Sequence, residues 1–193
     1  MEPKPDDPVQ FFAAPEDFER WLGEHHARAS CLWVKYAKKK SGIASIDWNA
    51  AVDVALCYGW IDGQSKRLDD TYALQRFTPR GKRSPWSKLN RERVARLTKA
   101  GRMQPAGLAE VARAKADGRW DAAYDSPATA RVPDDLAAAL ARSRKAKVAF
   151  DALDGTNRYA ILHRLQAARR PETRARRLAT FVAMLEQGEK LHR

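Results

Sequence analysis

The chain has few of the residues that mark metalloproteins and disulfide-stapled secreted domains. Its 193 residues include two cysteines, Cys31 and Cys57, which lie far apart and form no CxxC pair. This usage predicts neither a zinc site nor a disulfide framework. Four histidines are present. The adjacent pair, His25 and His26, would point about 100° apart on a helix and cannot chelate an ion together. We therefore expect no metal and no cofactor.

Long hydrophobic runs are also missing. No segment approaches the roughly 18 consecutive apolar residues of a membrane-spanning helix. Residues 1–15 are acidic and proline-rich, and they lack the basic start and apolar run of a signal peptide. We expect a cytoplasmic protein with no membrane span. No P-loop or GxGxxG pattern is present, so the sequence does not predict a nucleotide-binding fold.

Positive charge is abundant and unevenly distributed. The formal net charge is +12 and the sequence pI is about 10.0. Residues 66–102 carry twelve cations and three acids, whereas residues 1–30 carry seven acids and three cations. A basic surface of this kind attracts anions such as nucleic acid or phosphorylated metabolites. A solvated basic surface without a specific partner is the alternative interpretation.

Hydrophobic periodicity predicts an α+β chain. We expect a small antiparallel sheet with packed helices in residues 1–125, followed by a helical C-terminal module in residues 126–193. A helix capped by Ser84 with Pro85 in its first turn is expected to run to Lys99. Strands are expected at 9–13, 31–36, 65–68 and 72–78. Further helices are expected from Pro15, at 45–58, 105–118, 133–142, 146–153 and 157–168, and from Pro171 to Gly188.

Three strings carry a family resemblance: GWIDGQ (59–64), RFTPR (76–80) and SPWSKLN (84–90). They resemble the YdeI/OmpD-associated family of bacteria, and residues 156–185 are similar to the helical C-terminal domain of that family. The resemblance implies a YdhG-like fold for the N-terminal part and a role in bacteriocin protection or stress response. It carries over no catalytic residues.

Residues 58–90 form the candidate site, because they combine glycines, large aromatics and cations in one short span. Asp62 is expected in a loop after a helix, where it can act as a general base or orient an arginine. A structural salt bridge, or a turn that braces Gly63, is the alternative. The candidate ligand-binding residues are Trp60, Asp62, Gln64, Arg76, Phe77, Arg80, Ser84 and Trp86.

An anion pocket is the chemistry that this set favours. Arg76 and Arg80 lead into the expected helix start at Ser84, where free N–H groups and a partial positive charge attract anions. The three aromatic candidates can stack a planar ligand. The competing interpretation is a solvated basic turn with its tryptophans in the core.

Three functions follow from these observations. The first is a binding or stress-protection protein with a pocket for a small anionic or aromatic ligand and no established catalysis. The second is a nucleic-acid-associated protein that uses the basic surface of residues 66–102 and 158–177. The third is an enzyme with Asp62 as general acid or base. A protein partner is also open, and the sequence leaves the ligand, any turnover and the oligomeric state undecided.

Overall fold

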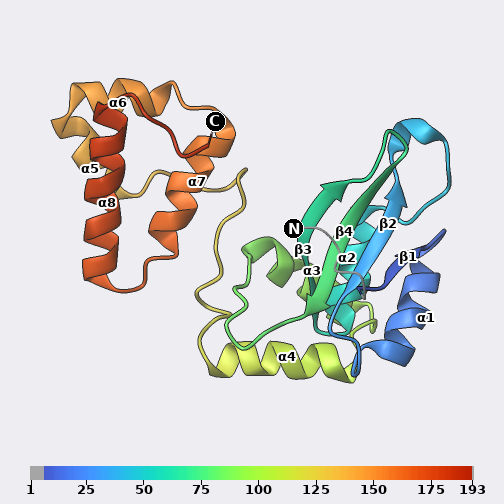
Figure 1. Ribbon diagram of the computed structural model, residues 1–193. Helices are drawn as coiled ribbons and strands as arrows, with labels where there is room; N and C mark the ends of the chain where they lie inside the picture. Colours follow the sequence, from blue (N-terminus) through green and yellow to red (C-terminus); the bar gives the residue numbers. More distant parts are fainter. Residues whose placement is uncertain (1–6, 193) are drawn as a thin grey trace. The chain divides into compact units, whose positions relative to one another are not determined.

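The computed structural model describes residues 7–192 and divides into two compact units (Figure 1). The first unit takes in the chain up to Trp86 together with Asn90–Ala123. The second takes in Ser87–Leu89 and the chain from Tyr124 onward. A four-stranded sheet and eight α-helices confirm the α+β class. Among the helices that the structure describes, none combines the length and the apolar character needed to cross a lipid bilayer.

The sheet of the first unit has the strand order β1-β2-β4-β3. Its strands are β1 (Val9–Phe11), β2 (Leu32–Ala37), β3 (Trp60–Arg67) and β4 (Tyr72–Pro79). Strand β1 pairs with β2 in parallel, whereas the other neighbours are antiparallel. The expectation of an antiparallel sheet therefore holds for three strands. The parallel edge arises because helix α1 (Pro15–His25) connects β1 to β2 as a crossover.

Strand β3 begins five residues earlier than the sequence pattern predicts, at Trp60 rather than Ser65. Gly59 has φ of 73° and ends helix α2 (Trp48–Cys57), so the chain enters the sheet at once. Asp62 consequently lies on a strand, opposite Phe77, and not in a loop. A register shift between Asp62 and Ser65 marks a bulge in this strand.

The helices of the first unit share one hydrophobic core with one face of the sheet. Leu32, Val34 and Phe77 on that face pack with Phe18 of α1 and Leu56 of α2 in a single cluster. In Figure 1, α2 lies behind the sheet. Helices α3 (Lys88–Lys99) and α4 (Pro105–Ala116) add their apolar side chains to the same cluster, and a short 3-10 turn, η1 (Lys39–Ser41), follows β2.

The helix expected to start at Ser84 and Pro85 begins instead at Lys88. Residues 84–86 before it have no regular secondary structure, and the carbonyl oxygens of Ser84 and Pro85 accept hydrogen bonds from Arg119 and Arg80. These two residues therefore offer acceptors to guanidinium groups. The expected row of free helix N–H groups is not formed at this position.

The second unit contains four helices around a core of its own. They are α5 (Asp134–Arg142), α6 (Arg144–Asp151), α7 (Gly155–Gln166) and α8 (Pro171–Glu186). Ser143 and Asp154 cap α6 and α7 with their side chains. Arg174 of α8 binds both carboxylate oxygens of Asp135, at 2.6 and 2.9 Å, and thereby joins α8 to α5. The core residues are Leu136, Leu140, Ala146, Phe150, Ile161, Leu162, Leu165, Phe181 and Leu185.

Candidate functional site

A pocket of about 320 Å³ opens in the first unit where the end of β4 meets α4. We call it the Arg80 pocket. Gly59 forms part of its wall. A Cβ atom at this position would lie 3.1 Å from the Ala106 carbonyl oxygen and 3.3 Å from Glu110 Cβ. The turn between α2 and β3 can therefore approach α4 closely. The lining residues are His26, Tyr58, Gly59, Trp60, Pro79, Arg80, Ala106, Ala109, Glu110 and Arg113.

Arg80 is held in place by its backbone and by Trp86. Its N–H donates to the Gly59 carbonyl at 3.0 Å, which fixes the end of β4 against the turn after α2. Its guanidinium lies 3.7 Å from the centre of the Trp86 ring, and Nη1 donates to the Pro85 carbonyl at 3.0 Å. A guanidinium stacked on an indole is held in one orientation, so this cation is preorganised.

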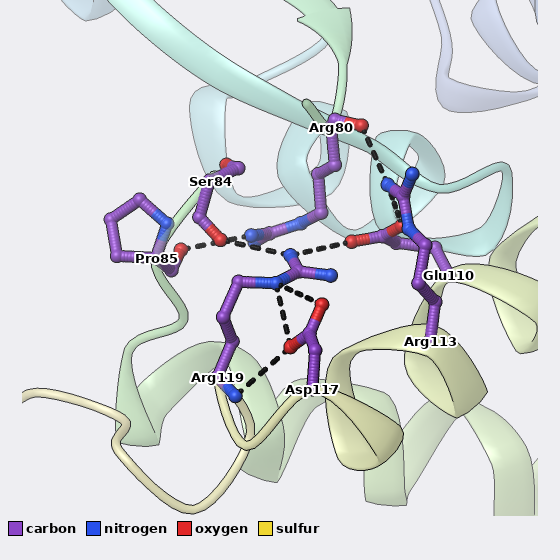
Figure 2. Close-up of polar contacts among 7 residues, drawn as sticks. All are labelled: Arg80, Ser84, Pro85, Glu110, Arg113, Asp117 and Arg119. Carbon is purple, nitrogen blue, oxygen red and sulfur yellow. Dashed lines mark hydrogen bonds and ion pairs between the residues drawn. The ribbon is translucent and has the colours of Figure 1, made fainter. Parts of the chain in front are cut away.

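Glu110 joins two further arginines at the pocket (Figure 2). It forms an ion pair with Arg113 and accepts a hydrogen bond from Arg119 Nη1 at 3.0 Å. Arg119 also donates from Nε to Asp117 at 2.8 Å and from Nη1 to the Ser84 carbonyl. Burial by itself would lower the pKa of Arg119, but its bonds to Asp117 and Glu110 outweigh burial and raise that pKa.

Three guanidinium groups and two carboxylates lie close together here (Figure 2). Arg113 and Arg119 pair with Glu110, and Arg119 also pairs with Asp117. The Arg119 side chain is 7% exposed. Its Nη2 is buried and has no hydrogen-bond partner in the described part of the chain. A buried donor left without an acceptor costs about 1–3 kcal/mol.

Trp86, next to Arg80, provides a second buried donor. Trp86 is 1% exposed, and within the described residues its Nε1 has no hydrogen-bond partner. Its ring is the surface on which Arg80 stacks. Several guanidinium groups gathered beside such donors favour the binding of an acceptor with negative charge.

The structure brings four of the eight predicted residues together at this cluster. Trp60 and Arg80 line the pocket, Trp86 lies under Arg80, and Ser84 accepts from Arg119. Trp60 is almost fully buried and donates from Nε1 to the His26 carbonyl at 3.2 Å. Its ring therefore serves the core as well as the pocket wall.

The other four predicted residues lie elsewhere in the first unit. Asp62 accepts a hydrogen bond from Trp48 Nε1 at 3.2 Å. The backbone carbonyl of Gln64 accepts from a glutamine of β4, within the bulge of β3. Phe77 is buried against Phe18 in the core. Arg76 pairs with Trp33 across β2 and β4 and faces away from the helices.

Sequence reasoning missed the residues that α4 and the following turn contribute. Glu110 and Arg113 stand three positions apart, a helical spacing at which opposite charges commonly pair. That spacing could have indicated the pair itself. Its meeting with Arg80 could not have been foreseen, because no local pattern shows that α4 packs beside the end of β4.

The arginines of the basic helix α3 form hydrogen bonds within the first unit. Arg93 donates to Asp53 at 2.8 Å, and Arg96 donates to the same carboxylate at 2.5 Å. Arg91 donates to the Trp120 carbonyl, and just beyond the helix Arg102 donates to Glu19. Much of the positive charge of α3 and the residues after it is therefore paired within the protein.

The fold and the Arg80 pocket define a two-part protein, with an α+β unit that holds the pocket and a helical unit that follows it. Residues 10–110, more than half of the chain, match the family model described as a domain of unknown function (DUF8412), so the chain belongs to that family. Residues 129–188 match the family described as bacteriocin-protection, YdeI or OmpD-associated, which confirms the suspected family through the helical C-terminal part. Comparison with curated proteins and with solved structures found no significant match.

Proposed function

We propose that this YdeI/OmpD-associated protein is a cytoplasmic binding protein of the stress-protection type, and that its Arg80 pocket takes a small anion. The observation that carries the proposal is the meeting of Arg80 and Arg113 at the pocket wall, with the Arg80 guanidinium held on the Trp86 ring and the Arg113 side chain 42% exposed. An oxyanion such as a phosphate or carboxylate accepts charge-assisted, bidentate hydrogen bonds from guanidinium groups arranged in this way.

The pocket also fits a ligand with a planar part. Tyr58 contributes aromatic surface to the lining, and a volume of about 320 Å³ suits a small metabolite. Binding rather than catalysis is supported by the state of Glu110, the carboxylate of the pocket. It is engaged by both Arg113 and Arg119, so its oxygens are already used as acceptors.

Arg113 provides the sharpest test, because its side chain is 42% exposed and can be changed without opening the core. Thermal unfolding is followed with inorganic phosphate, sulfate, small carboxylates and mononucleotides, at low and moderate salt. A ligand that binds only the folded state raises the melting temperature by mass action. At a ligand concentration of a hundred times Kd, it adds about 2.7 kcal/mol to the free energy of unfolding. We expect such a rise with at least one anion and its loss in Arg113→Ala.

Lys82→Ala is the matched control, since Lys82 is an exposed cation of the loop before α3 and does not line the pocket. This variant should respond to the anion as the parent does. Equal shifts in the parent, Arg113→Ala and Lys82→Ala would show that the anion acts on general surface charge, and the pocket proposal would be wrong.

A further inference from the structure

His26 lies at the wall of the Arg80 pocket, at the end of helix α1. It is the C-terminal capping residue of that helix and lines the pocket together with Tyr58. Its backbone carbonyl accepts a hydrogen bond from Trp60 Nε1 at 3.2 Å. The centre of its imidazole ring lies 5.3 Å from the centre of the Tyr58 ring. Both the backbone and the side chain of His26 are therefore restrained at the pocket.

One ring nitrogen of His26 is already used within the helix. Its Nδ1 lies 2.8 Å from the Leu22 carbonyl oxygen, one turn earlier. A carbonyl oxygen can only accept a hydrogen bond, so Nδ1 carries a proton in both charge states of the ring. The other nitrogen, Nε2, has no hydrogen-bond partner among the residues that the structure describes. Protonation of His26 therefore changes Nε2 alone, from a lone pair to an N–H donor.

The charged groups that share the pocket wall with this ring come from β4 and α4. Arg80 and Arg113 bring guanidinium groups to the lining, and Glu110 is ion-paired with Arg113. Within α1, Glu19 is held in an ion pair and does not line the pocket. Burial raises the pKa of Tyr58, so its phenol stays protonated where histidine titrates. Histidine is the side chain whose charge ordinarily changes between about pH 5 and 8, so we assign a change in the charge of this wall over that range to the imidazole.

We propose that His26 is a ligand-binding residue of the Arg80 pocket, and that it couples anion binding to the uptake of a proton from solvent at Nε2. This role rests on the proposed anion pocket and adds the residue that sets its dependence on pH. Neutral His26 presents a lone pair, which repels an oxyanion. Protonated His26 presents a positively charged N–H, and hydrogen bonds between such a group and an anion are the strong ones. The affinity for an anion therefore rises as pH falls through the range in which histidine titrates.

Sulfate is the probe, because it stays a dianion between about pH 5.5 and 8, whereas a phosphate group titrates within that range. Isothermal titration calorimetry gives the sulfate affinity at each pH. Repeating the titration in buffers of different ionisation enthalpy gives the number of protons taken up on binding. We expect the affinity of the parent protein to rise about 10-fold to 100-fold from the upper to the lower end of the range, the ratio that one charge-assisted hydrogen bond supplies. Near the middle of the range, binding should take up a fraction of a proton.

Two substitutions of adjacent histidines separate the role of Nε2 from general effects of pH. His26→Gln places a neutral amide near the position of Nε2, so this variant should bind sulfate with an affinity that no longer depends on pH. His25→Gln is the matched control. His25 makes the same kind of Nδ1 contact, 3.0 Å from the Trp21 carbonyl oxygen one turn earlier, but it does not line the pocket. The control should keep the parental pH profile and the parental proton uptake.

A sulfate affinity that does not change with pH in the parent, or a parental pH profile in His26→Gln, would overturn the role of His26 and leave the anion pocket standing. If the parent binds no sulfate even at the acidic end of the range, the role of His26 is also wrong. The other anions of the thermal-unfolding panel then decide whether the pocket takes an anion at all. Should His26→Gln fail to fold, as judged by circular dichroism, His26→Asn decides, because its amide keeps an N–H for the Leu22 carbonyl and has no group that titrates.

Discussion

At the scale of single residues, burial governs the chemistry of the Cys57 thiol. Burial raises the pKa of Cys57 from 9.0 to about 11, with smaller effects from neighbouring charges. Between pH 9 and 11 the unfolded chain loses this proton while the folded protein keeps it. The stabilising contribution of the protonated thiol is therefore complete below pH 9 and declines as pH rises through that window.

We predict that the free energy of unfolding falls faster between pH 9 and 11 in the parent than in Cys57→Ala. The difference should amount to about 2 kcal/mol across the window. At about 1.4 kcal/mol for each pH unit, a pKa rise from 9.0 to about 11 corresponds to about 3 kcal/mol in full, and most of it develops between pH 9 and 11. Denaturant unfolding at several pH values measures it, and Cys57→Ala cancels the contribution of tyrosines and lysines that titrate in both proteins. Parallel pH profiles for the two proteins would contradict a strongly shifted thiol.

Residue types at the Arg80 pocket could be predicted only in part from the sequence. Arg80 and Trp86 stood out because cations, aromatics and glycines cluster around them, and they do lie together. Arg119, which follows Gly118 in an ordinary turn, gave no such signal. Its importance comes from burial and from two partners further away in sequence, Glu110 and Ser84, and neither is visible in a local pattern.

At the scale of elements, the packing of α2 against α4 depends on one glycine. A Cβ atom at Gly107 would lie 2.1 Å from the Cys57 carbonyl oxygen and 2.7 Å from its carbon, both of them backbone atoms. The N–H of Gln104 donates to the same carbonyl at 3.1 Å and ties the start of α4 to the end of α2. The two helices can keep this distance only while position 107 has no side chain.

We predict that Gly107→Ala destabilises the first unit by about 3 kcal/mol, the upper part of the range for overpacked sites, because the helices must separate. Gly23→Ala is the matched control. Gly23 is also a helical glycine, but its Cβ would make an ordinary contact of 3.6 Å with the Tyr58 hydroxyl. That variant should be neutral or more stable by up to about 1 kcal/mol. Chemical denaturation of the two variants provides the comparison, and similar stabilities would show that α4 shifts freely.

Element types were more predictable than element starts. The positions of three prolines predicted helices α1, α4 and α8 correctly, because Pro15, Pro105 and Pro171 occupy the first turns of these helices. The start of α3 was misplaced, since Ser84 and Pro85 have the residue types of a helix start but interact with Arg119 and Arg80 instead. Tertiary hydrogen bonds outweighed the local signal there.

At the scale of the whole molecule, the tryptophans are confined to the first unit. All six lie at or before position 120, and residues 124–193 contain none. The second unit has its own core, in which Leu165 is fully buried. Tryptophan fluorescence therefore reports the first unit, whereas helical circular dichroism reports both.

We predict that Leu165→Ala lowers the midpoint of part of the circular dichroism transition and leaves the tryptophan transition in place. The expected loss in the second unit is about 2–5 kcal/mol, as for other buried leucines. Leu97→Ala, in the core of the first unit, should have the converse effect. An equal shift of both signals in either variant would mean that the two units unfold as one, and the predicted boundary at residues 125/126 would not be a folding boundary.

The edges of the sheet have a consequence for behaviour at high concentration. An unpaired strand edge is a template for strands of other molecules, and proteins blunt such edges by shortness, bulges and charge. Strand β1 offers three residues, and β3 is interrupted by its bulge and carries Lys66 and Arg67 beyond it. Neither edge gives a long flat row of backbone groups. The sheet is therefore a poor seed for intermolecular β-structure, and concentrated solutions should resist fibril formation.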